Sequence, residues 1–146
     1  MRAILFAAFA LAACAAPAGG ADPAPPMPPP HQAQTYSEDL ARLDADLRAP
    51  WIIAARIGEI ADLGDGLLVR PIEVVQDSRC PANVDCVWAG LLQVRVVIAG
   101  SGEQVVTLGA PVATPRGSFV LAVASPSRWH EPPTEPPPYR FGFRRV

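Results

Sequence analysis

Cys80 and Cys86 are the residues whose type and spacing most plainly permit chemistry, because paired thiols can react, bind a metal or form a disulfide. A redox-active pair normally has two residues between its thiols and lies at the start of a helix, whereas five residues separate this pair. A zinc site needs four ligands, and the only histidines are His31 and His130. In an oxidising compartment we therefore predict a disulfide, with a redox pair and a metal site as the less favoured alternatives. Closing this seven-residue loop would contribute roughly 2.4 kcal/mol.

Asp77, Ser78 and Arg79 precede this loop and are the other polar residues that could take part in catalysis. A nucleophilic serine needs a general base, and His130 is the only candidate within the predicted folded domain. A hydrolase-like envelope enzyme with a site near Asp77 and His130 is therefore kept as the alternative function. The favoured interpretation is that Asp77 and Ser78 bond turn amides, and that Arg79 pairs with a carboxylate or with loop carbonyls.

Sequence signals for cofactors, metals and nucleic acids are missing. There is no glycine-rich phosphate loop, no carboxylate pair and no histidine cluster with metal-ligand spacing. We therefore predict no catalytic residue, no metal and no cofactor. Without Arg2, the charge is 11 arginines minus 14 acidic residues, or −3, and the arginines are scattered. This distribution gives no basic stripe, so we expect no nucleic-acid partner.

The first residues predict export. Met1 and Arg2 give a positive start, and residues 3–13 are apolar but too short to span a bilayer. The segment 11–14 (LAAC) resembles the lipobox of bacterial lipoproteins, which implies that residues 1–13 are a signal peptide and that Cys14 carries the lipid. A lipid on Cys14 also explains the third, unpaired cysteine. By the same resemblance, Ala15 implies the outer membrane, facing the periplasm.

A tether and a short helix are expected to connect the anchor to the folded domain. Residues 14–34 form the lipidated cysteine and tether, and seven prolines follow Cys14 there. Twenty extended residues could reach roughly 60 Å. Residues 35–50 predict an amphipathic helix, because a capping box opens the segment and the apolar spacing is four, three and four. The residues that give this pattern are Thr35 and Glu38 for the box, then Tyr36, Leu40, Leu43 and Leu47.

Residues 51–146 predict a mainly β domain, a small antiparallel β-sandwich or barrel. Short β-rich runs alternate with turns, at residues 52–63, 67–76, 87–99, 103–108, 118–124 and 139–144. In the run 87–99, alternation places Gln93 and Arg95 outward. The same alternation puts Trp88 on the inward, core face with Leu92, Val94, Val96 and Ile98, with an exposed binding platform as the alternative for Trp88.

The stretch from Asp77 to Gly90 resembles the signature of small, mostly uncharacterised bacterial exported proteins and lipoproteins. The matching residues are Asp77, Ser78, Arg79, Cys80, Pro81, Val84, Cys86, Trp88, Ala89 and Gly90. Gln76 departs from the pattern, since an acidic residue often precedes the aspartate. The resemblance implies an exported β domain and no established reaction.

These observations together predict a non-catalytic cell-envelope lipoprotein. Its lipid attaches it to the membrane, and its tethered β domain is expected to bind a protein, a peptide or a cell-wall component. Candidate binding residues are Arg79, Arg95 on the outward sheet face, and Trp129 in a proline-rich segment. Trp129 could anchor a partner or a sugar ring, or could pack over the end of the sandwich.

Overall fold

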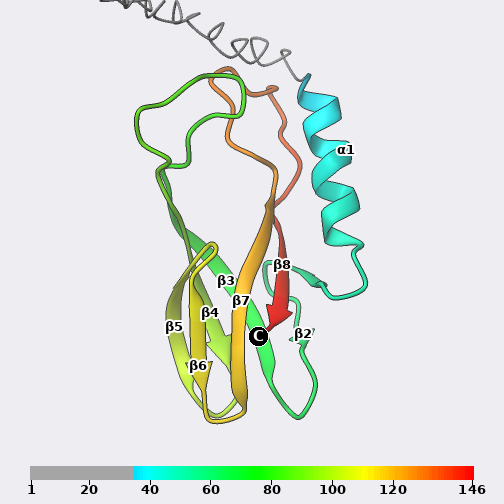
Figure 1. Cartoon of the computed structure of the whole chain (residues 1–146), viewed down its shortest axis with the longest axis vertical. Helices are drawn as coiled ribbons and strands as arrows, with labels where there is room; N and C mark the ends of the chain where they lie inside the picture. The colour runs from blue at the N-terminus through cyan, green and yellow to red at the C-terminus, as the bar shows by residue number, and fades with distance from the viewer. Residues whose placement is uncertain (1–34) are drawn as a thin grey trace, which may run out of the picture. The chain divides into compact units, whose positions relative to one another are not determined.

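The computed structural model describes residues 35–146, which form one helix and eight strands (Figure 1). The predicted signal peptide, the lipidation site Cys14 and the tether lie outside these described residues. Helix α1 spans Tyr36–Leu47. The strands are β1 (Ile53–Arg56), β2 (Ala61–Asp62), β3 (Leu68–Asp77), β4 (Leu92–Ile98), β5 (Gly102–Thr107), β6 (Pro111–Thr114), β7 (Gly117–Ser125) and β8 (Arg140–Arg145).

The strands form two four-stranded antiparallel sheets, in the orders β1-β8-β7-β6 and β2-β3-β4-β5. The sheets pack face to face and are not closed into a barrel, so of the two predicted architectures the sandwich is confirmed. Their shared core includes Phe119, Phe141 and Phe143 from one sheet and Val69, Leu92, Val94 and Val96 from the other. The single helix of residues 35–146, α1, is not long and apolar enough to cross a membrane.

Strand β4 shows the predicted alternation. Leu92, Val94, Val96 and Ile98 are buried, whereas the intervening residues are only partly covered. Strand β3 pairs with it through a shift of register between Pro71 and Glu73. A bulge at that point is expected because proline cannot donate a ladder hydrogen bond.

Helix α1 also follows its prediction. The hydroxyl of Thr35 accepts from the backbone N–H of Glu38, and the Glu38 carboxylate accepts from the N–H of Thr35, which completes the capping box. Leu43 and Leu47 are buried where the helix packs on the β1-β8-β7-β6 sheet. Gly142 permits this close packing, since a Cβ there would lie 3.1 Å from a Leu47 methyl carbon.

Residues 52–63, predicted as one strand, instead form β1 and β2 in different sheets. Gly58 has a φ of +85°, and its backbone N–H donates to the carbonyl of Pro71 on β3. A positive φ turns the chain at this point and is readily adopted only by glycine. Strand β6 was not predicted, because its four residues begin with a proline, which the pattern for strands disfavours.

The prediction that Trp88 lies in the core is wrong: its side chain is 82 % exposed. The strand begins at Leu92 rather than at residue 87. Gly90, with a φ of +65°, ends the alternation, and its Cα approaches the chain so closely that a Cβ would clash with the carbonyl of Ser78. The alternative, an exposed Trp88, is what the structure shows.

Candidate functional site

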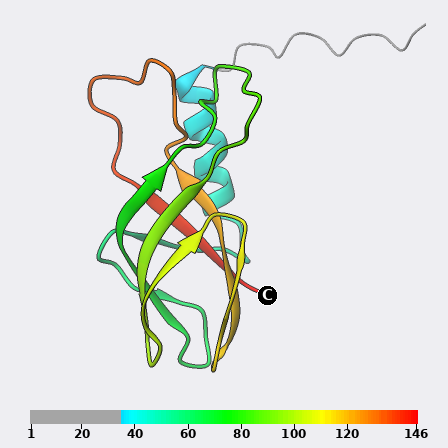
Figure 2. The same ribbon diagram turned by 90° about the vertical axis from the view of Figure 1, so that its left-hand side faces the viewer.

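Two loops and the first turn of α1 meet at one end of the sandwich, which we call the loop end (Figures 1 and 2). The first loop, residues 78–91, is the disulfide loop, and the second, residues 126–139, is the proline-rich loop. The N–H of Ala82 donates to the carbonyl of Arg128 at 2.8 Å, which joins the two loops. The rings of Tyr36 and Trp129 meet edge to face at 5.4 Å between centroids, which joins the proline-rich loop to the helix.

The disulfide loop is closed twice. Cys80 and Cys86 form the predicted disulfide, with their Cα atoms 5.8 Å apart, an ordinary separation for this bond. Below it, the N–H of Cys80 donates to the carbonyl of Ala89 at 3.0 Å, and the N–H of Ser78 donates to that of Leu91 at 2.8 Å. The loop is therefore a constrained extension of the β3–β4 pair.

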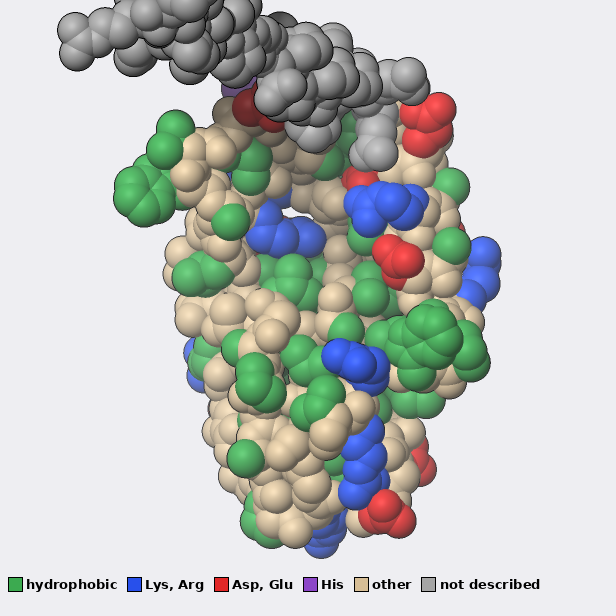
Figure 3. Space-filling model, in the orientation of Figure 1, with side chains coloured by type: hydrophobic (Ala, Val, Ile, Leu, Met, Phe, Trp, Pro, Cys, Tyr) green, Lys and Arg blue, Asp and Glu red, His purple; other side chains and the backbone are tan. Residues whose placement is uncertain are grey.

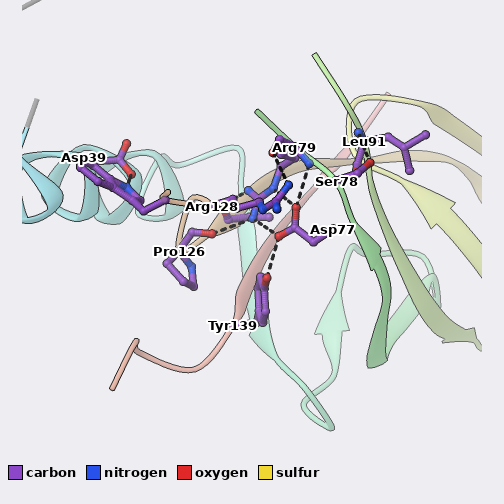
Figure 4. A network of polar contacts seen from close by, with 10 residues as sticks. Asp39, Asp77, Ser78, Arg79, Leu91, Pro126, Arg128 and Tyr139 are labelled. Carbon is purple, nitrogen blue, oxygen red and sulfur yellow. Dashed lines mark hydrogen bonds and ion pairs between the residues drawn. The ribbon is translucent and has the colours of Figure 1, made fainter. Parts of the chain in front are cut away.

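An ion pair between Asp77 and Arg79 forms the base of the loop end (Figure 4). Their side chains are 12 % and 15 % exposed, and the contact is bidentate, with Nη2–Oδ2 at 2.7 Å and Nε–Oδ1 at 2.9 Å. The hydroxyl of Tyr139 donates to the same carboxylate at 2.7 Å. Arg79 also donates to the carbonyls of Ala124 and Pro126, at 3.3 and 2.9 Å. One guanidinium thus fastens the disulfide loop to β7 and the proline-rich loop.

This network fixes the charges of its members. Burial alone would raise the pKa of Asp77, but hydrogen bonds from Arg79 and Tyr139 and the Arg79 charge hold that pKa below its ordinary value. Burial and the hydrogen bond to Asp77 raise the pKa of Tyr139. Near neutral pH, Asp77 is therefore ionised and paired, which suits a structural anchor better than a general base.

The groups of the hydrolase-like alternative are held in separate contacts. The Ser78 hydroxyl accepts from the N–H of Leu91 and donates to its carbonyl, both at 3.2 Å. His130 is exposed, and its backbone N–H donates to Oδ1 of Asn83 at 2.9 Å. Within residues 35–146, no hydrogen bond links the His130 side chain to Asp77 or Ser78.

The three candidate binding residues occupy different places. Arg79 is committed to the internal network just described. Arg95 lies on the outward face of β4, where its Nε contacts Oε1 of Glu73 at 2.8 Å, with both side chains well exposed. Trp129 is half-buried and donates its indole N–H to Oδ2 of Asp39 at 3.2 Å. Arg79 and Trp129 therefore hold the loop end together, and Arg95 alone of the three faces outward.

Asp39 has a structural role at the loop end that the sequence pattern did not indicate. Its side chain is only 1 % exposed. Burial alone would raise the pKa of Asp39, but hydrogen bonds from Ser127, Arg42 and Trp129 hold that pKa below its ordinary value. The capping-box spacing located the helix, but no local pattern links Asp39 to Trp129, ninety residues later.

The most exposed apolar residues of the loop end are Val87 and Trp88, which we call the apolar tip. Val87 is 94 % exposed and Trp88 is 82 % exposed, and Val84 and Leu91 beside them are partly exposed. Apolar side chains project from the surface at the disulfide loop in Figure 3. Large apolar residues held in water on a constrained loop are typical of a contact surface.

Other kinds of site find less support among residues 35–146. No group of three or more His, Cys, Asp or Glu side chains there is arranged to hold a metal ion. A shallow hollow is lined by residues of β1, by Glu59 and by Arg140, and it includes no residue of either loop. Comparisons with protein families, with curated proteins and with solved structures found no match to this chain.

Proposed function

We propose that this protein is a non-catalytic cell-envelope lipoprotein whose β domain, tethered through a lipid on Cys14, binds an envelope component through its loop end. From its sequence, the partner is predicted to be a protein, a peptide or a cell-wall component. The observation that carries the proposal is the apolar tip: Val87 and Trp88 are displayed to solvent on a loop that is fixed at its base.

The fixed base supports a binding role. Ordering a flexible loop on binding costs about 0.5–1.5 kcal/mol for each immobilised side chain, and a loop that is already constrained avoids much of that cost. Here a disulfide, two cross-loop backbone hydrogen bonds and the Asp77–Arg79 pair constrain the loop before any partner arrives. Tryptophan is also among the residues that contribute most to binding energy at interfaces.

The internal pairing of the polar groups supports a role without catalysis. The Asp77 carboxylate, the Arg79 guanidinium and the Ser78 hydroxyl all bond to groups of the protein itself. A catalytic group must instead reach the substrate. The apolar tip is the part of the disulfide loop that offers a partner large, exposed apolar side chains.

The number of cysteines supports a lipid anchor on Cys14. Cys80 and Cys86 are used by the disulfide, so Cys14 is the one cysteine of the three without a partner in the chain. A lipid on that sulfur would account for it without a free thiol in an oxidising compartment.

Photo-crosslinking in intact cells tests this function. A photoreactive phenylalanine analogue replaces Trp88 in the full-length protein. Trp51 provides the matched control position, because its side chain is 65 % exposed and lies between α1 and β1 in the chain. We expect an adduct with an envelope component from position 88 and none from position 51. A third probe at Arg95 tests the outer sheet face: adducts from position 95 with none from position 88 would contradict the assignment of the loop end.

A further inference from the structure

We propose that the envelope component met by the apolar tip is the lipid–water interface of the membrane that carries the anchor. In this inference, which rests on the proposed function, Val87 and Trp88 enter the headgroup region and hold the loop end against the bilayer.

The chemistry of the tip favours lipid. Tryptophan combines an apolar ring with a polar N–H, and it is enriched where membranes meet water. Its neighbour Val87, which is 94 % exposed, has no polar group in its side chain. A sugar-binding platform would need hydrogen-bonding groups beside the aromatic ring, whereas an adjacent valine adds only apolar area.

The position of the tip also favours the anchoring membrane. The tether leads into Thr35, and the first turn of α1 belongs to the loop end through the contact of Tyr36 with Trp129. The proline-rich loop in turn bonds to the disulfide loop, through His130 to Asn83 at 2.9 Å. The chain therefore enters the domain at the same end that displays the tip (Figures 1 and 2). The end nearest the anchor in sequence is the end that carries the exposed tryptophan.

The size of the tip fits a tethered membrane contact better than an independent protein complex. A large aromatic side chain buries about 150–250 Å² on contact, and a stable protein interface needs about 800 Å² from each partner. One tryptophan and one valine fall well short of that area. A domain already attached to the membrane needs far less, because the tether raises the effective concentration of the lipid surface.

The charges around the tip indicate which lipids it meets. Asp85 lies on the disulfide loop, and Glu131 and Glu135 lie on the proline-rich loop, all of them exposed. Arg128 is the exposed cation among these two loops, and its guanidinium donates to the carbonyl of Arg79. An acidic surround is repelled by anionic headgroups, so the inference is for zwitterionic lipid.

Quenching by brominated lipid tests the inference. The full-length lipidated protein is placed in phosphatidylethanolamine and phosphatidylcholine vesicles with or without bromine on the acyl chains, and tryptophan emission is measured. We expect bromine to lower the emission of the wild type and of Trp51→Phe by the same amount. The emission of Trp88→Phe should fall far less, since it comes from Trp51 and from Trp129, whose ring is half-buried. Trp51 is a suitable control because it follows the C-terminal end of α1, whereas the N-terminal end of this helix belongs to the loop end. The twelve residues of α1 separate its two ends by about 18 Å.

A second variant keeps the test informative without removing a tryptophan. Val87→Asp leaves Trp88 in place, and we expect it to lose most of the quenching while circular dichroism shows an unchanged fold. Replacing part of the lipid with phosphatidylglycerol at low salt should reduce quenching of the wild type. Stronger quenching with the anionic lipid would overturn the assignment to zwitterionic lipid.

The failures of the two proposals are distinguishable. Equal wild-type emission in plain and brominated vesicles would overturn the membrane contact. A protein or cell-wall adduct from position 88 in cells, together with that result, would leave the proposed function standing with a different partner. A mass spectrum of the mature protein without lipid on Cys14 would overturn the anchored function itself.

Discussion

The disulfide loop and strand β4 follow one another in the chain, and both contain large apolar residues, but they place them oppositely. Val87 and Trp88 are almost fully exposed, whereas Leu92, Val94 and Val96 are fully buried. The difference arises at Gly90, after which the chain joins the ladder between β3 and β5. Hydrophobicity alone therefore does not bury a residue in this protein. Burial requires the regular strand that turns alternate side chains toward the second sheet.

The strongest test of this comparison places the same substitution on both sides of Gly90. Val96→Asp should unfold the domain, because an unpaired charge in an apolar core costs several kcal/mol against a total stability of about 5–15 kcal/mol. Val87→Asp should change the free energy of unfolding by about 0.5 kcal/mol or less, as expected for an exposed position. Urea denaturation followed by circular dichroism measures both. Similar losses of stability in the two variants would show that the loop packs in solution.

Removing the disulfide should cause the next largest loss of stability. Cys80→Ser/Cys86→Ser should lower the free energy of unfolding by about 2 to 4 kcal/mol, since the unfolded chain regains the entropy of the open loop. Thiol titration of the unfolded wild type should find no free thiol at either position. Two reactive thiols in the native protein, or release of a metal ion on mutation, would instead favour the redox or metal alternatives.

Breaking the buried ion pair of Asp77 and Arg79 should have a smaller effect on stability, and this effect should depend on pH. Asp77→Asn should cost about 2 kcal/mol at neutral pH, because it leaves the Arg79 charge without its carboxylate in a mostly buried site. Since the folded-state pKa of Asp77 is lowered, its contribution is fully present above the ordinary aspartate pKa of about 3.9 and is lost as the pH falls through the folded value.

The difference in stability between wild type and Asp77→Asn should therefore shrink at acidic pH. Thermal unfolding of both proteins from neutral pH down to pH values below about 3.9 measures this difference. A difference that stays constant through the acidic range would show that Asp77 does not act through its charge.

The sequence predicts the parts of this fold that depend on near neighbours. The capping box of α1, the alternation of β4 and the disulfide across seven residues all depend on residues close together in the chain. Predicting the candidate binding surface at the loop end required knowledge of the complete fold. Trp88 is exposed because strand β4 begins only at Leu92. The alternating pattern of the sequence instead predicted a strand that continues across Gly90. The residues that hold the loop end meet over long separations, 62 residues for Asp77 with Tyr139 and 90 for Asp39 with Trp129. No periodicity encodes such pairs, because their contact depends on the complete sandwich.

The smallest expected effect comes from the exposed ion pair between Arg95 and Glu73, which contrasts with the buried pair of Asp77 and Arg79. Exposed pairs contribute about 0.2–1 kcal/mol, since water and salt already screen their charges. Arg95→Gln and Glu73→Gln should each therefore lower the free energy of unfolding only slightly, and the double variant should lose little more than either single one. Urea denaturation of the three variants at low and high salt measures the coupling, which should disappear at high salt. A coupling of several kcal/mol that persists in salt would mean that this face of β3 and β4 is covered in solution. In that case the outer sheet face, and not the loop end alone, would contact a partner or a second copy of the chain.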